Sequence, residues 1–173
     1  MNSSPERLTI DASVWIDYLD SESERHALAL ALFELAERGE VELWAAPQGY
    51  RLDRMRAESV EQLREAFERE EVNQARQVAR VSEVTFPGED QFPGHHVEGF
   101  VEAWATIAEN WPKAPGPADR FHVETHMVEG RDVFITDDKR LLKMCRLLSD
   151  RHGFSIEAMP LGDYFARRPR MQS

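Results

Sequence analysis

The sequence has almost no cysteine, no long apolar run and a shortage of positive charge. Cys145 is the only cysteine among 173 residues, so an internal disulfide is excluded, which fits a reducing compartment. A transmembrane helix is not expected, because no run of about 18 apolar residues exists. The opening stretch MNSSPERLTI lacks the basic start and apolar segment of a secretory signal. These absences predict a cytoplasmic protein with no membrane association.

The shortage of positive charge also limits the ways in which the protein could bind nucleic acid. Lys and Arg number 21 against 32 Asp and Glu, which gives a net charge of −11. A protein that coats a duplex is normally basic, so tight, metal-free binding over a broad surface is not expected. A nuclease is still compatible with this charge, because clustered carboxylates can hold a divalent metal that receives the phosphate.

The order of expected elements predicts an α/β fold in a single domain, residues 1–173, with a parallel sheet between layers of helices. Residues 72–117 are interpreted as a helical and loop insertion, either a cap on the core or an aromatic lid over a substrate. Ser13 is expected to cap the helical turn after the first strand. Strands are expected at 8–10, 41–47, 133–135 and 154–159, and helices at 21–40, 49–84 (two helices), 100–111, 118–130, 138–153 and 161–168.

Acidic residues follow the apolar strands at the places where such folds collect functional groups. Asp11 ends the first strand, and the adjacent pair Asp137 and Asp138 follows Val133–Ile135. Asp119 opens a helix that can begin near the same edge, so Asp11, Asp119 and Asp138 are predicted to converge. Oxygen ligands of this kind favour Mg²⁺ or Mn²⁺. The chemistry that such a site serves is attack of water on a phosphodiester.

Two motifs in the sequence resemble those of a known family. The first is LTIDAS, an apolar strand followed by Asp11 and Ser13. The second is ADRFHVETHMVEGRDVFITDDKRLL, in which the spacing of acids, glycine and threonine is specific. Its motif positions are Asp119, His122, Gly130, Asp132, Thr136 and Asp138. With these motifs the chain resembles the PIN-domain ribonucleases, which include the VapC-like toxins of bacterial toxin–antitoxin pairs.

The resemblance implies a PIN-like sheet, a Mg²⁺- or Mn²⁺-dependent endoribonuclease, and metal binding by Asp11, Asp119 and Asp138. It places Asp137 at a variable, supporting position and lets Thr136 orient a water or cap the turn. It also implies an RNA substrate, a small antitoxin partner and a homodimer. The family usually carries a further Glu early in the helix after the second strand, and here the nearest acid is Asp53.

Other interpretations of the same residues remain open. Asp11 could cap a turn, Asp119 could act only through the helix dipole, and Asp53 could pair with a neighbouring arginine. His122 is expected to be buried or to support the site rather than to catalyse. A PIN-like binding or scaffold protein that has lost catalysis is the main functional alternative. A phosphoryl-accepting α/β domain is a third, but no lysine is suitably placed after a strand to support it.

Overall fold

The centre of the computed structural model, which describes residues 4–45, 79–81 and 97–168, is a parallel sheet of five strands. Short apolar runs form its middle, since Val133, Phe134 and Ile135 are all fully buried. Strands that are covered on both faces are apolar in this way. The strands are β1 (Glu6–Ile10), β2 (Val41–Ala45), β3 (Ala79–Val81), β4 (Val133–Ile135) and β5 (Ala158–Met159).

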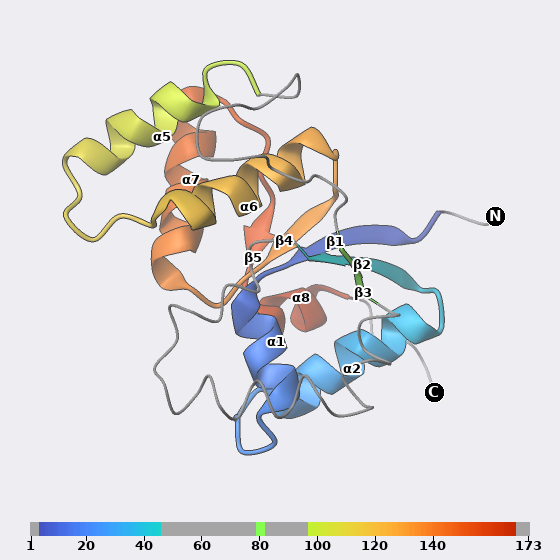
Figure 1. The fold of residues 1–173 in the computed structure, drawn as a ribbon. Helices are drawn as coiled ribbons and strands as arrows, with labels where there is room; N and C mark the ends of the chain where they lie inside the picture. Colours follow the sequence, from blue (N-terminus) through green and yellow to red (C-terminus); the bar gives the residue numbers. More distant parts are fainter. Residues whose placement is uncertain (1–3, 46–78, 82–96, 169–173) are drawn as a thin grey trace.

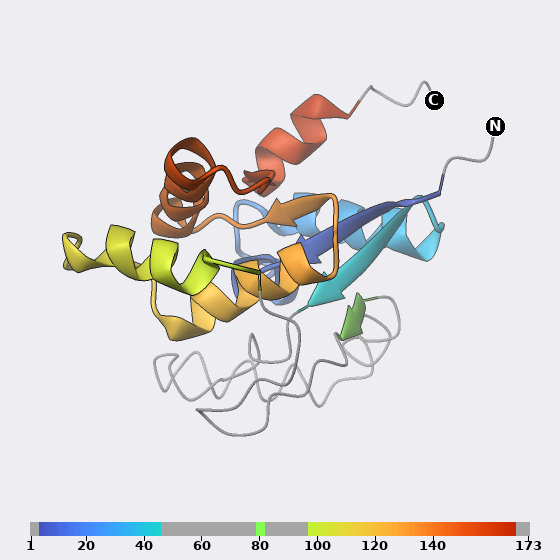
Figure 2. The same ribbon diagram turned by 90° about the horizontal axis from the view of Figure 1, so that it is seen from above.

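The strands lie in the order β3-β2-β1-β4-β5, and every neighbouring pair is parallel. The blue β1 can be followed in Figure 2 between the cyan β2 and the orange β4. From β1 the chain adds β2 and β3 on one side, and it then returns to add β4 and β5 on the other. The strand order therefore reverses between β1 and β4, which are paired through Ile10 and Ile135.

Helices cover both faces of the sheet (Figure 1). Within the described ranges, two groups of three helices pack on opposite faces. One core joins Leu8, Ile10 and Val133 of the sheet to the first group. The other core joins Phe134 of the sheet to the second group. The first group is α1 (Ala12–Leu19), α2 (His26–Glu37) and α8 (Leu161–Arg167), and the second is α5 (Phe100–Glu109), α6 (Pro117–Val128) and α7 (Lys139–His152).

The predicted α/β class, with a parallel sheet between helices, is confirmed, but three local predictions are wrong. The first helical turn is capped by Asp11 and not by Ser13, because the Asp11 side chain accepts the N–H of Ala12. Residues 79–81, which were expected to be helical, form β3, because pairing with β2 overrides a locally helical pattern. The last strand is confined to Ala158–Met159, the two residues that pair with Phe134 and Ile135 of β4.

None of the helices in the described part of the chain has the length and apolar character needed to cross a bilayer. The lone cysteine, Cys145, is buried as a free thiol, and burial raises its pKa to about 12.

Candidate active site

The predicted acids Asp11 and Asp138 lie where the strand order reverses. Asp11 follows β1, and Thr136 to Asp138 follow β4, so both groups leave the carboxyl edge of adjacent strands. The N–H of Asp11 donates to the carbonyl of Ile135 at 3.0 Å, which holds the two strand ends together. Open parallel sheets bind ligands at such a reversal, because the two neighbouring connections run to opposite sides and leave a crevice.

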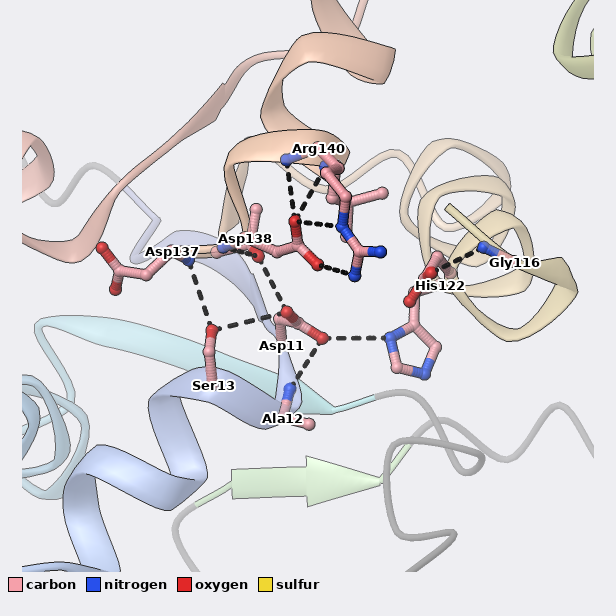
Figure 3. A network of polar contacts seen from close by, with 11 residues as sticks. Asp11, Ala12, Ser13, Gly116, His122, Asp137, Asp138 and Arg140 are labelled. Atoms are coloured by element: carbon pink, nitrogen blue, oxygen red, sulfur yellow. Dashed lines mark hydrogen bonds and ion pairs between the residues drawn. The ribbon is translucent and has the colours of Figure 1, made fainter. Parts of the chain in front are cut away.

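Among the predicted acids that the structure describes, Asp11 is the most enclosed, with 8% of its surface exposed. One carboxylate oxygen accepts the N–H of Ala12 at 2.7 Å, and the other accepts the hydroxyl of Thr136 at 2.7 Å (Figure 3). Ser13 donates to the second oxygen over 3.4 Å. Burial alone raises the pKa of Asp11, but His122 and these hydrogen bonds outweigh it and lower the pKa below its ordinary value. Asp11 is therefore kept ionised.

His122 approaches Asp11 from α6, one turn after Asp119. Its Nδ1 lies 3.4 Å from Oδ1 of Asp11, an ion-pair distance without hydrogen-bond geometry. The ring is 4% exposed, which confirms the prediction that His122 is buried. Its Nε2 has no hydrogen-bond partner among the described residues. Figure 3 shows the ring pointing at the Asp11 carboxylate, so this histidine is part of the site.

Asp119 occupies the first turn of α6, as predicted, where Pro117 begins the helix. Its Oδ2 accepts the N–H of Gly116 at 2.8 Å, which satisfies one backbone donor at the helix start. Burial raises the pKa of Asp119, the bond from Gly116 opposes this, and repulsion from Asp11 and Asp138 raises it further. The three predicted carboxylates are thus close enough to influence one another electrostatically.

Asp138 begins α7 as its N-cap residue. Its Oδ1 accepts the N–H groups of Arg140 and Leu141 at 2.7 and 3.3 Å. The guanidinium of Arg140 turns back over the same carboxylate, with Nη2 3.1 Å from Oδ2. Thr136 accepts the N–H of Asp138 at 3.1 Å, so its hydroxyl closes the turn and also holds Asp11. The sequence did not indicate Arg140 as a site residue, although it follows Asp138 by only two positions.

Asp137 points away from Asp138 and Asp11 (Figure 3). Its carboxylate lies 3.6 Å from Nε of Arg25, which also binds the buried Asp17 at 2.7 Å. Burial raises the pKa of Asp137, and Arg25 opposes that rise. The N–H of Asp137 donates to Ser13 at 3.3 Å. Asp137 is therefore a supporting residue that ties the end of β4 to α1, and Arg25 and Asp17 are members of this network that the sequence did not indicate.

The donor set suits a hard divalent cation, since Asp11, Asp119 and Asp138 offer carboxylate oxygens whose mutual repulsion a cation relieves. Within residues 4–45, 79–81 and 97–168, however, no group of three or more His, Cys, Asp or Glu side chains is close enough to hold a metal ion. Asp11 and Asp138 lie at one edge of the sheet, and the described residues form no complete ligand shell around them. The fourth predicted acid, Asp53, lies outside the described residues.

Comparison of the chain with models of known protein families and with curated proteins finds no match to either.

Proposed function

We propose that the protein is a Mg²⁺- or Mn²⁺-dependent endoribonuclease with a PIN-like fold. The observation that supports this proposal is the position of Asp11 and Asp138 at the carboxyl ends of two adjacent strands, where the strand order reverses, with Asp119 near enough in α6 to be influenced by their charge. The spacing of the two sequence motifs, which resemble those of PIN-domain ribonucleases, agrees with it.

In this proposal Asp11, Asp119 and Asp138 hold the metal. A bound Mg²⁺ or Mn²⁺ supplies a polarised water and stabilises the charge of a phosphodiester during hydrolysis. Thr136 orients the Asp11 carboxylate through its 2.7 Å hydrogen bond and fixes the start of α7. His122 lies beside Asp11, with its Nδ1 3.4 Å from Oδ1 of the carboxylate. Because the pKa of Asp11 is lowered, this carboxylate stays available as an anion in mildly acidic solution.

The partners in this proposal are an RNA substrate, a second copy of the chain and a small antitoxin protein. The antitoxin, if one exists, would cover the acidic edge with a basic side chain. This part of the proposal is supported by the pairing of Arg140 with Asp138 within the chain, because a guanidinium of the antitoxin would pair with a carboxylate in the same way.

The acidic pair after β4 supplies the sharpest test of this function. Asp138→Asn should abolish Mn²⁺-dependent cleavage of an unstructured RNA, because it removes one of three anionic ligands while an amide oxygen can still cap α7. Asp137→Asn is the matched control, since it changes the charge by the same amount one residue away. It should keep a substantial part of the activity, because Asp137 faces Arg25. Equal loss in both variants would refute the assignment of Asp138.

A PIN-like binding or scaffold protein without catalysis is the second candidate, and two observations favour it. Arg140 already pairs with Asp138, and no three-ligand metal group forms among residues 4–45, 79–81 and 97–168. This candidate predicts that wild-type protein cleaves no RNA with millimolar Mn²⁺ and that its melting temperature is unchanged by the metal. Cleavage by wild type that disappears in Asp138→Asn would exclude it.

A further inference from the structure

The helix that leaves the candidate site is strongly basic within an acidic protein. α7 carries five Lys and Arg residues against one acid, Asp150, whereas the whole chain has a net charge of −11. Its basic residues are Lys139, Arg140, Lys143, Arg146 and Arg151. The helix begins directly after Asp138, so positive charge starts where the predicted metal ligands end.

Three of these cations share one side of the helix. Lys139, Lys143 and Arg146 follow an i, i+4, i+7 spacing, which places them within about 60° of one another around the helix axis. All three are exposed. The ammonium of Lys143 lies 4.6 Å from the ring centroid of Trp111, a cation–π contact that restricts where this side chain can go. We call these three residues the α7 stripe.

The α7 stripe lines a groove of about 640 Å³ between α7 and the segment that contains β5. Met159 and Pro160 border the groove, and Met159 accepts the N–H of Thr136 at 3.1 Å. The groove therefore reaches the same carboxyl edge of the sheet that carries the candidate site. From there the groove extends along α7, away from Asp138.

The groove is also lined by acidic residues, and their positions determine where its positive charge lies. Asp150 lies at the far end of the stripe, one helical turn beyond Arg146. Glu157, on the opposite wall, is paired with Arg167. Asp163 borders the groove from α8. The cations of the α7 stripe therefore lie on the first two turns of α7, next to Asp138, and Asp150 follows them, while Asp163 adds a negative charge on the α8 side.

We propose that the α7 groove binds the phosphate backbone of single-stranded RNA and leads the strand to or from the acidic edge. This inference rests on the proposed function for the identity of the ligand. A polyanion that approaches three carboxylates needs neighbouring cations to offset the repulsion, and the α7 stripe supplies them in continuity with Asp138. Contacts with phosphates position the strand without selecting its sequence.

Binding is measured first in EDTA, with full-length protein and a short, unstructured, fluorescently labelled RNA. The test variant is Lys143→Gln/Arg146→Gln, which leaves Lys139 and the candidate site untouched. The control is Arg38→Gln/Arg151→Gln, which removes the same charge from exposed positions outside the groove. The test variant should bind roughly tenfold more weakly, and the slope of log affinity against log salt should fall by about one to two. The control should resemble wild type.

Cleavage with Mn²⁺ then separates this inference from the proposed function. The test variant should raise KM and leave kcat unchanged, because it alters binding away from the reacting phosphate. If wild type binds through the stripe but never cleaves, the nuclease proposal fails and the groove assignment stands. If wild type cleaves and the two double variants have the same KM and RNA affinity, the groove assignment fails. Displacement of the RNA by polyglutamate at equal concentration would identify an acidic polypeptide as the ligand and overturn the assignment to RNA.

Discussion

Replacing Thr136 by valine should destabilise the protein far more than replacing it by serine. Thr136 is fully buried, and its hydroxyl donates to Oδ2 of Asp11 at 2.7 Å while it accepts the N–H of Asp138 at 3.1 Å. Valine keeps the shape of the side chain and removes both hydrogen bonds. A hydrogen bond to a charged group contributes about 1.5–3 kcal/mol, and an unsatisfied buried N–H costs about 1–3 kcal/mol.

The expected loss in the free energy of unfolding is therefore about 3–5 kcal/mol for Thr136→Val. Thr136→Ser keeps the hydroxyl and loses one methyl group, which costs about 1 kcal/mol. Urea denaturation at neutral pH, followed by circular dichroism without metal, measures both values. Equal destabilisation by the two variants would show that packing of the methyl group, and not the hydroxyl, is what matters, and the hydrogen-bond argument would be wrong.

The same comparison has a pH dependence with a defined sign. The pKa of Asp11 is lowered in the folded protein, partly by Thr136, so ionised Asp11 contributes stability that is present above its unfolded pKa. That contribution is lost as the pH falls through the folded pKa. Because Thr136→Val weakens it, the gap in stability between wild type and this variant should narrow below about pH 4.

Three further predictions concern the remaining ionisable groups. Millimolar Mn²⁺ should raise the melting temperature of wild type by mass action, and Asp11→Asn should lose this response, so an unresponsive wild type would contradict the proposed metal site. Asp119→Asn should raise the metal-free melting temperature at pH 7, because the pKa of Asp119 is raised by burial and by neighbouring acids and its ionised form is unfavourable; a lower melting temperature would contradict this. The pKa of His126 is lowered to about 4, first by burial and then by Arg131, so stability should fall by about 3 kcal/mol as the pH drops from 6.5 towards 4. His126→Asn should show a flatter pH profile in urea titrations, and an unchanged profile would mean that another group titrates.

The sequence was sufficient to place Asp11 and Asp138 at the carboxyl ends of their strands, because the signals for these positions are local. An apolar run that ends in an acid marks both the strand and its carboxyl end, as in Leu8–Asp11 and Val133–Asp138. The parallel arrangement then follows from the alternation of strands and helices, which brings these ends to one edge. The position of Asp119 also followed from a local signal, the helix start at Pro117.

Other parts of the site depend on contacts that leave no local pattern. Arg25, the residue that precedes α2, meets Asp137 through the folded chain alone, because 112 positions separate the two residues. The strand β3 has three residues, and its pairing with β2 determines its conformation more than its own sequence does. Asp11, and not the predicted Ser13, caps α1, and the Asp11 carboxylate is held in place by Thr136 at the end of the neighbouring strand.

Asp137 and Asp138 are adjacent in the sequence, but their side chains point in different directions, which reduces the repulsion between the two carboxylates. Asp137 lies near Arg25. Figure 3 shows that its carboxylate points away from Asp138, which turns towards Arg140 and the start of α7. Each acid thus has a guanidinium nearby, although Arg25 is shared between Asp137 and Asp17, and the two contacts differ in accessibility. The side chain of Asp138 is 29% exposed and that of Asp137 is 14% exposed. An exposed ion pair contributes little stability, so Arg140 can leave Asp138 at small cost when a cation or phosphate approaches. The more enclosed contact with Arg25 holds Asp137 at the strand end. In the proposed function, this difference favours Asp138 as the member of the pair that binds metal.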